Sequence, residues 1–235
     1  MDRLSDETVA IYDRVAAVYD AGRRKDLFER VWLERALCDA APGAAVLDLG
    51  CGAGAPIAEW LVAQGFAVTG LDAAPGMLAL FRARLPGTET VLADMRDLDL
   101  GRRFAAIIGW GSFFHLRPEE QRAALPRLAG HLAPGGRLLL TVGPEASERI
   151  GSVGGAPVYH ASLAPGDYAA ILSQADVRVE RFAPEAADAA GFSLLLARRA
   201  GQAGRDQQSG RDATDGQAGR GNSDRAKARN SGSFH

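Results

Sequence analysis

The chain has 235 residues, of which 47% are hydrophobic and 24% charged, values that are typical of a globular protein with one core. Its 27 Lys and Arg residues against 29 Asp and Glu residues leave a formal net charge of −2, which excludes the basic excess of many nucleic-acid-binding proteins. The apolar runs at 104–110 and 137–142 are too short to span a membrane, and residues 1–20 lack the pattern of a signal peptide. We therefore predict a cytoplasmic protein with neither nucleic acid nor a membrane as its partner.

Composition divides the chain into three segments. Residues 201–235 consist almost entirely of small and polar residues, and Phe234 is their only large apolar side chain. Such a segment buries too little surface to offset its ordering entropy, so we predict a disordered low-complexity tail. The remaining chain is predicted to hold leading helices within 1–40 and a folded domain over 41–200.

Hydrophobic spacing predicts that helices and strands alternate after the leading helices. Residues 6–39 have helical spacing with a break at Gly22, which predicts two helices. Short apolar runs then predict strands at 45–49, 67–71, 90–93, 105–110, 137–142, 177–182 and 192–197. Helical patterns between them cover 56–64, 75–85, 119–132 and 165–174.

This order of elements predicts an α/β fold. Strands separated by helices of this length form right-handed βαβ units, whereas the last two strands have no helix between them and are expected to pair antiparallel. We predict a doubly wound, mostly parallel, seven-stranded sheet of Rossmann-like type, with helices on both faces and an antiparallel hairpin at one edge. Residues 143–164 are glycine-rich and are predicted to form a long loop over a substrate.

The turn after the first predicted strand is the most informative segment. Asp48 is followed by the alternating glycines Gly50, Gly52 and Gly54, which let a ligand approach the backbone closely. Asp72 ends the second strand about 20 residues later, where an acid accepts hydrogen bonds from the ribose hydroxyls of an adenosyl cofactor. Dinucleotides share that ribose with other adenosyl cofactors. Asp48 distinguishes the two classes of cofactor, because an acid there repels a pyrophosphate but suits a ligand with an ammonium group.

From about residue 8 to 199 the chain resembles the class I S-adenosylmethionine-dependent methyltransferases. The motifs that carry this resemblance are 48–54 for the glycine turn, 71–78 for the second strand, 93–96 for the third and 131–138 before the fifth. Segments 11–20, 110–116 and 158–163 resemble more narrowly a bacterial group of small-molecule methyltransferases. The resemblance implies S-adenosylmethionine as cofactor and transfer of its methyl group to an oxygen, nitrogen or carbon of a small molecule.

The resemblance also implies a set of cofactor-binding residues. The glycine turn would lie against the methionine part, Asp72 would hold the ribose, and Asp94 would accept from the adenine amino group. Aromatic side chains and Arg23 on the leading helices would close over the cofactor, although the same stripe suits packing on the domain. The implied cofactor-binding residues are Asp48, Gly50, Cys51, Gly52, Asp72, Ala73, Met77, Asp94, Met95, Trp110, Tyr12 and Tyr19.

Methyl transfer from a sulfonium requires alignment and exclusion of water, and it needs neither a metal nor a covalent enzyme nucleophile. The two cysteines have no partners at metal-ligand spacing, so we predict no metal site. His115 is the first candidate for a general base, with a structural hydrogen bond to the backbone as its alternative role. Tyr159 and His160 are the second candidates for acceptor contact, with anchoring of the predicted loop as theirs.

Two other functional classes remain open from the sequence. An NAD-dependent oxidoreductase would use a G-x-G-x-x-A turn, which Gly50, Gly52 and Ala55 satisfy, but Asp48 argues against it. A non-catalytic adenosyl-ligand-binding protein is the second alternative, because Gly111 occupies a position where the resembled group leads us to expect a carboxylate. The acceptor is not named by the sequence, and both a monomer and a homodimer are open.

Overall fold

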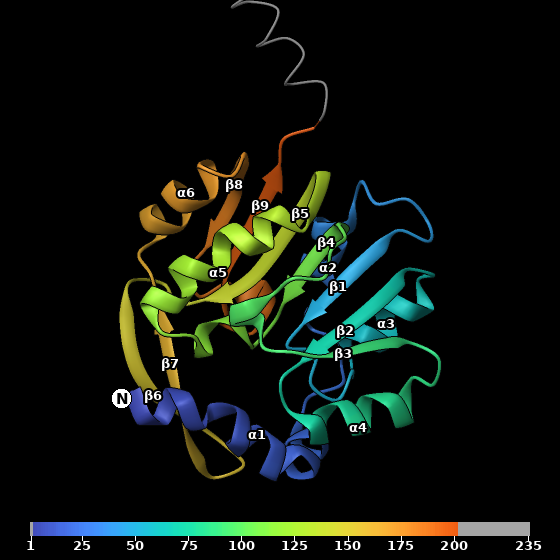
Figure 1. Ribbon diagram of the computed structural model, residues 1–235, viewed down its shortest axis with the longest axis vertical. Coiled ribbons are helices and arrows are strands. Elements are labelled where there is room, and N and C mark those ends of the chain that lie inside the picture. The colour runs from blue at the N-terminus through green and yellow to red at the C-terminus, as the bar shows by residue number, and fades with distance from the viewer. Residues whose placement is uncertain (1, 202–235) are drawn as a thin grey trace, which may run out of the picture. The chain divides into compact units, whose positions relative to one another are not determined.

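The computed structural model of the protein describes residues 2–201, and its seven-stranded sheet has the order β3-β2-β1-β4-β5-β9-β8 (Figure 1). The strands are β1 (Ala45–Leu49), β2 (Ala67–Asp72), β3 (Glu89–Leu92), β4 (Phe104–Gly109), β5 (Leu132–Val142), β8 (Val177–Ala183) and β9 (Ser193–Arg199). Strands β1 to β5 pair parallel, and β9 is antiparallel to both β5 and β8. The predicted doubly wound sheet with an antiparallel edge is therefore confirmed.

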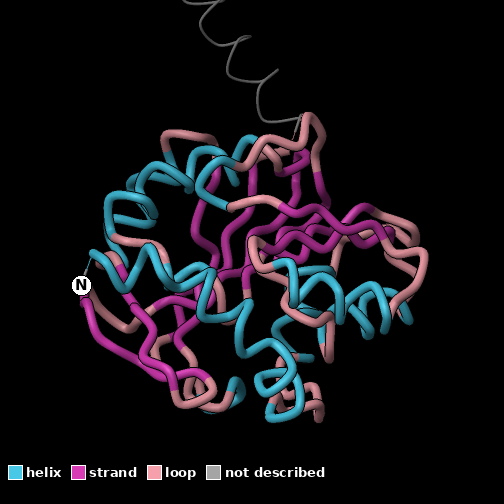
Figure 2. Tube along the Cα trace, turned by 60° about the horizontal axis from the view of Figure 1, so that its bottom comes forward, coloured by secondary structure: helices cyan, strands magenta, loops and turns pink. Residues whose placement is uncertain are grey.

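Helices cover both faces of this sheet, as Figure 2 shows. They are α1 (Asp2–Gly22), α2 (Arg30–Leu37), α3 (Ile57–Ala63), α4 (Pro75–Arg84), α5 (Pro118–Gly130) and α6 (Pro165–Ser173). Because side chains alternate along a strand, the side chains of β1 pack into two hydrophobic cores, one on each face of the sheet. Leu47 and Leu49 pack toward α5 and α6, whereas Val46 packs toward α2 and α3. Both layers are apolar, which explains why the parallel strands are nearly continuous hydrophobic runs.

The order of the strands determines where a ligand binds. Strand β1 has β2 on one side and β4 on the other, so the crossover connections leave it in opposite directions. In open α/β sheets this switch point forms a crevice beyond the carboxyl ends of the strands. The glycine turn predicted to bind a cofactor begins at this crevice, directly after β1.

The predicted long loop at 143–164 is wrong, because most of it forms a second, two-stranded sheet. Strands β6 (Ser147–Val153) and β7 (Ala156–Ser162) pair antiparallel, with Val153 opposite Ala156. The turn between them is Gly154-Gly155, with φ of +55° and +80°, the conformation that a tight hairpin requires. The glycines that suggested a loop are the residues that permit the hairpin.

Helix α1 lies along the carboxyl edge of the large sheet, between α4 and the hairpin (Figure 1). Asp13 on α1 accepts a hydrogen bond of 2.6 Å from the backbone N–H of Gly76, in the first turn of α4. At the other side Val15 packs against Gly154, where an added Cβ would approach the Val15 Cβ to 3.2 Å. The two leading helices predicted within 1–40 are thus present, and α1 packs against both α4 and the hairpin.

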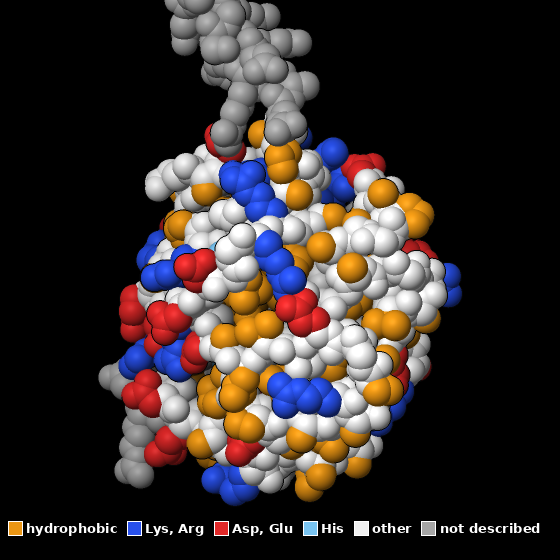
Figure 3. All heavy atoms as spheres, turned by 45° about the vertical axis from the view of Figure 1, so that its right-hand side comes forward, with side chains coloured by type: hydrophobic (Ala, Val, Ile, Leu, Met, Phe, Trp, Pro, Cys, Tyr) orange, Lys and Arg blue, Asp and Glu red, His pale blue; other side chains and the backbone are white. Residues whose placement is uncertain are grey.

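Charged side chains of both signs are interspersed with apolar ones on the face of the molecule shown in Figure 3. Over residues 2–201 no helix combines the length and apolarity needed to cross a membrane. The predicted disordered tail lies, from residue 202 onward, outside the described residues and stays a prediction.

Candidate active site

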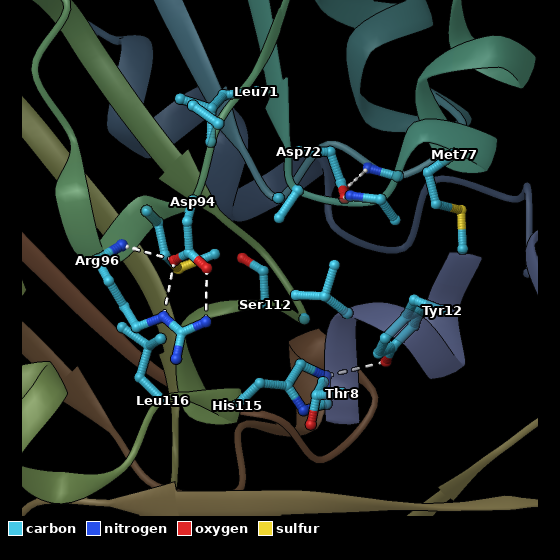
Figure 4. A pocket seen from close by; sticks show the side chains of 18 of the residues that line it. Thr8, Tyr12, Leu71, Asp72, Met77, Asp94, Arg96, Ser112, His115 and Leu116 are labelled. Carbon is cyan, nitrogen blue, oxygen red and sulfur yellow. Dashed lines mark hydrogen bonds and ion pairs between the residues drawn. The ribbon is translucent and has the colours of Figure 1, made fainter. Parts of the chain in front are cut away.

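A pocket lies at the crevice, between the carboxyl ends of β1 to β4 and helix α1 (Figure 4). It brings together residues that were predicted from separate motifs along the chain. The predicted residues that line it are Tyr12, Tyr19, Gly50, Gly52, Asp72, Ala73, Met77, Asp94, Met95, Trp110 and His115. Asp48 and Cys51 line an adjoining pocket under the glycine turn, which shares Tyr19, Gly50, Gly52 and Trp110 with the first.

Other lining residues were not predicted. Ser5, Thr8 and Val9 come from α1, and Arg96 and Glu120 close the end of the pocket near Asp94. Positions 5, 8, 12 and 19 of α1 recur at helical spacing, so the same face that carries the predicted tyrosines could have identified them. Arg96 and Glu120 had no such signal, because their contact joins two segments that are distant in sequence.

Two glycines of the turn serve different purposes. Gly50 has φ of +71°, and a Cβ there would lie 2.3 Å from the Cβ of Ser112, so no larger residue fits. Gly52 has φ of +53°, and its Cβ would point into the pocket, 3.9 Å from Tyr19 and 4.0 Å from Met77. The first glycine is required by packing, whereas the second leaves room for a ligand beside the backbone.

The carboxylate of Asp72 is oriented by the backbone. Its Oδ2 accepts a 2.9 Å hydrogen bond from the N–H of Gly52, and its Oδ1 accepts one of 2.9 Å from the N–H of Ala74. Burial raises the pKa of Asp72, and these two backbone hydrogen bonds oppose the rise. The acid that ends β2 is thus tied to the glycine turn at the wall of the pocket.

Asp48 is a second buried acid at the same turn, with 3% of its surface exposed. Burial, with a smaller contribution from the negative charge of Asp72, raises its pKa to about 7, and Arg23 opposes that rise. The carboxyl group is therefore near its midpoint of ionisation at neutral pH. A cationic group placed beside it would favour the ionised form.

Arg23 lines the adjoining pocket and is held by a buried partner. Its guanidinium contacts the carboxylate of Glu29, which has no exposed surface. The second oxygen of Glu29 has no hydrogen-bond partner within residues 2–201. The glycine turn therefore has an acid on one side, Asp48, and a fixed guanidinium on the other.

At the far end of the pocket Asp94 is ion-paired. Both of its oxygens accept hydrogen bonds from the Arg96 side chain, at 2.6 and 3.0 Å, and Oδ1 also accepts from the Arg96 backbone N–H at 2.9 Å. Partial burial would raise the pKa of Asp94, but the hydrogen bonds from Arg96 outweigh it and lower the pKa. Arg96 also contacts Glu120 at 3.0 Å, which fixes the guanidinium across this end.

His115 has both ring nitrogens engaged. Its Nδ1 lies 2.8 Å from the carbonyl oxygen of Tyr159, which can only accept, so Nδ1 donates. Its Nε2 then accepts from the hydroxyl of Tyr12 at 2.9 Å, an interaction drawn in Figure 4. Burial lowers the pKa of His115 to about 4, so the ring is neutral at pH 7. The backbone hydrogen bond that was the alternative role of His115 is present, and Tyr12 stands between its Nε2 and the pocket.

Tyr159 and His160 are adjacent on β7 but lie differently. The Tyr159 side chain is fully buried, and its hydroxyl donates to Glu148 at 2.7 Å. It lines neither of the two pockets at the glycine turn, so the geometry argues against acceptor contact by this phenol. The imidazole of His160 packs near His115, with ring centroids 4.9 Å apart.

Trp110, at the end of β4, lines both pockets at the glycine turn. Only 7% of its surface is exposed, and its indole N–H has no hydrogen-bond partner within the part of the chain that the structure describes. It packs against both Phe28 and Phe192, at centroid distances of 6.0 and 5.9 Å. A Cβ at the next residue, Gly111, would meet open space, although φ of +70° disfavours any other residue there.

Comparison with known proteins places these features in context. Residues 46–136 match the family described as a methyltransferase domain. A dTDP-3-amino-3,6-dideoxy-alpha-D-glucopyranose N,N-dimethyltransferase from Streptomyces fradiae is 41% identical over 96 residues, which are 40% of this chain and 37% of that protein. A trans-aconitate 2-methyltransferase from Methylobacterium nodulans is 41% identical over 152 residues, 59% of this chain and 52% of that protein. The chain spans about half or less of the length of these relatives.

Solved structures match over more of the chain. An amino pentose methyltransferase from Micromonospora echinaspora, involved in calicheamicin biosynthesis and solved with S-adenosylmethionine bound, is 26% identical with a TM-score of 0.61. That match covers 78% of this chain and 95% of the other. The CcbJ methyltransferase from Streptomyces caelestis has a TM-score of 0.64 at 21% identity, over 82% of this chain and 98% of the other. These likenesses confirm the predicted fold.

Proposed function

We propose that this chain, a member of the class I S-adenosylmethionine-dependent methyltransferase superfamily, transfers the methyl group of S-adenosylmethionine to a small molecule. Relatives that act on small molecules and a structural neighbour that binds S-adenosylmethionine support the reaction and the cofactor. A location in the cytoplasm, a monomeric or homodimeric state and the capping role of the leading helices stay predictions from the sequence.

One observation carries the choice of cofactor. Asp48 is a buried acid at the glycine turn, where a dinucleotide would have to place its pyrophosphate. A buried carboxylate next to a pyrophosphate would repel it, whereas a ligand with an ammonium group gains from Asp48. The same observation makes an NAD-dependent oxidoreductase the weaker alternative.

The pocket residues fit each part of this cofactor. The methionine ammonium would bind at Asp48 and the methionine carboxylate at Arg23, beside the backbone of Gly52. Asp72 would accept hydrogen bonds from the ribose hydroxyls. The adenine would lie between Met77 and Asp94 and Met95, which follow β3. The N–H of Trp110 is a buried donor with no hydrogen-bond partner among residues 2–201, as expected beside a ligand.

When bound, the cofactor supplies an electrophilic methyl group on a positively charged sulfur, and the protein supplies alignment and a dry site. Tyr12 lies over the pocket with its hydroxyl oriented by His115. Because both nitrogens of His115 are engaged and its pKa is about 4, we assign it a positioning role toward Tyr12. The hydroxyl oxygen of Tyr12 keeps a lone pair to orient the reacting groups.

The test is a calorimetric titration of the protein with S-adenosylmethionine, S-adenosylhomocysteine and NAD in parallel. We expect the first two to bind, and Asp72→Ala to weaken both by about 2 kcal/mol or more, the scale of charged hydrogen bonds. Asp26→Ala is the matched control, because Asp26 is exposed and pairs only locally with Arg24. Binding of NAD alone would overturn the proposal. Cofactor binding without methyl transfer to any acceptor would instead favour the non-catalytic alternative.

A further inference from the structure

A second pocket lies beside the first, on the other side of His115. It is formed by the end of β5, the hairpin β6–β7 and the segment between β8 and β9. Phe114 and His160 line it, and their rings contact one another at a centroid distance of 4.6 Å. His115 lines the first pocket and lies 4.9 Å from His160 in the second, so the two pockets adjoin at these imidazoles.

The hairpin is built to place the His160 ring. An added Cβ at Gly151, on the opposite strand, would lie 2.4 Å from the Cε1 atom of His160, so a glycine is required under the imidazole. Burial and the nearby charge of Arg149 lower the pKa of His160, which keeps the ring neutral at pH 7. Unlike His115, His160 makes no hydrogen bond to any residue in the range 2–201, so both of its nitrogens remain available.

Arg149 stands directly opposite His160 in the hairpin and lines the same pocket. Opposite residues of an antiparallel pair project from the same face of the sheet. The guanidinium of Arg149 has neither an ion pair nor a hydrogen bond with the part of the chain described. Glu185, on the segment between β8 and β9, lines the pocket without pairing with Arg149. The pocket thus presents a cation, a carboxylate and a neutral imidazole as separate groups.

We propose that this second pocket holds the methyl acceptor, and that the acceptor is a small molecule with a carboxylate or phosphate group that Arg149 binds. Glu185 accepts a hydrogen bond from a hydroxyl or amino group of the same molecule. This inference rests on the proposed function and assigns the substrate class of that reaction. Arg149 and Glu185 are both exposed at the pocket, where a guanidinium binds a carboxylate or phosphate in two parallel hydrogen bonds and a carboxylate accepts from a hydroxyl or amino group.

His160 faces the reacting end of such an acceptor. The lone pair of the nucleophile forms the bond to the methyl carbon, and the carbon–sulfur bond breaks with its electron pair remaining on sulfur. The proton of an O–H or N–H nucleophile passes to a free nitrogen of His160. Because His160 is only partly buried, it returns that proton to water.

The experiment uses the full chain saturated with S-adenosylhomocysteine, and binding of that ligand is measured first. Calorimetry then follows titration with inorganic phosphate, malate, glucose 1-phosphate and, as the uncharged control, glucose. We expect millimolar or tighter binding of malate or glucose 1-phosphate and none of glucose. Malate and glucose 1-phosphate separate a carboxylate from a phosphate as the anion.

Arg149→Gln should weaken anion binding by about tenfold or more, the effect of one lost charged hydrogen bond, while leaving S-adenosylhomocysteine affinity unchanged. Arg178→Gln is the matched control, since Arg178 is an exposed arginine on a strand that does not line the pocket. The imidazole resonance of His160, assigned by its loss in His160→Gln, should shift when the anion binds.

Failure of all three anions to bind the loaded protein would overturn the acceptor assignment. So would anion binding that survives Arg149→Gln, which would be adventitious, or binding that leaves the His160 resonance unmoved. If S-adenosylhomocysteine itself does not bind, the proposed function fails before the acceptor is tested. The two failures are therefore distinguishable.

Discussion

The two halves of the crevice are held in different ways. On the cofactor side, Asp72 is fixed by backbone N–H groups of Gly52 and Ala74, 20 and 2 residues away in sequence. On the side of the proposed acceptor pocket, His115 is fixed by the Tyr12 hydroxyl and the Tyr159 carbonyl, 103 and 44 residues away. Local turn chemistry thus encodes the first half, whereas tertiary packing encodes the second. Substitutions in the two halves should therefore have different effects on the protein.

The largest effect is expected at Gly50, in the local half. Gly50→Ala must accommodate both φ of +71° and a Cβ 2.3 Å from that of Ser112, so we expect a loss of about 3 kcal/mol in the free energy of unfolding. Cofactor affinity should fall with it, because the turn must shift. Urea denaturation and calorimetry measure the two losses.

Gly65→Ala separates the clash from the backbone strain. Gly65 has φ of +81°, but its Cβ would meet nothing within 4 Å. Only the strain remains, for which we expect a cost of about 1 kcal/mol and unchanged cofactor affinity. Equal losses in the two variants would mean that the contact with Ser112 does not restrict the turn.

The same division explains what the sequence could predict. The strand that carries Asp48 near its end, the glycine turn and the spacing to Asp72 are local patterns with a direct physical meaning, and the structure places those residues at two adjoining pockets. The hairpin β6–β7 was missed because Gly151, Gly154 and Gly155 weaken every strand signal. Gly151 and Gly154 make sense only beside their partners, the His160 ring and Val15 on α1.

Side-chain contacts across the crevice could not be predicted from the sequence either. Nothing in the neighbourhood of Arg96 indicates Glu120, and nothing near Arg23 shows that Glu29 becomes its buried partner. The role of His115 is the clearest case. Its position after β4 predicted a ring at the pocket, but only the fold shows that Tyr12 and Tyr159 occupy both nitrogens.

Tyr12→Phe tests the half of the crevice that tertiary packing holds in place. Removing the hydroxyl deletes the group that His115 holds in place to orient the reacting groups, so we expect kcat to fall by about a hundredfold, the scale of a small misplacement of those groups. Affinity for S-adenosylhomocysteine should change by about threefold at most, because the ring remains. The measurement is steady-state kinetics with any acceptor that the screen identifies.

Tyr159→Phe is the control for this variant. Its hydroxyl contacts Glu148 and its carbonyl, which holds His115, is retained. The rate should therefore stay near that of the wild type. A larger loss in Tyr159→Phe than in Tyr12→Phe would reverse our assignment of the two tyrosines.

Asp48 gives the local half a pH dependence. Its pKa of about 7 means that the carboxyl loses its charge as the pH falls below 7. Between about pH 5.5 and 7 the α-amino group of S-adenosylhomocysteine stays protonated, so cofactor affinity should fall about tenfold over roughly one pH unit of that window. Asp48→Asn should bind more weakly at pH 7 and lose this slope. A slope that survives in Asp48→Asn would assign the titration to another group.

The pH dependence of folding stability has the opposite sign to the pH dependence of cofactor affinity. A folded pKa raised to about 7 means that the native protein binds more protons than the unfolded chain between about pH 4 and 7. The contribution of Asp48 to stability without cofactor is thus greatest below the unfolded pKa and is lost as the pH rises through 7. Urea midpoints across this range should rise relative to the wild type in Asp48→Asn, most clearly at the alkaline end.

The smallest effect is expected for the contact between α1 and α4. The residue before α4, Ala74, supplies no side-chain cap, and Asp13 of α1 instead accepts the hydrogen bond from the Gly76 N–H in the first turn of α4. Asp13→Ala should therefore cost about 1 kcal/mol in unfolding free energy, the value of a lost helix cap. Because α1 also carries Tyr12 and Tyr19 over the pocket, cofactor affinity should fall by about threefold. Glu34→Ala, which removes an exposed ion pair with Arg30, is the matched control and should change neither quantity. If Asp13→Ala weakens stability but leaves cofactor affinity at the control value, α1 packs on the domain without closing the site.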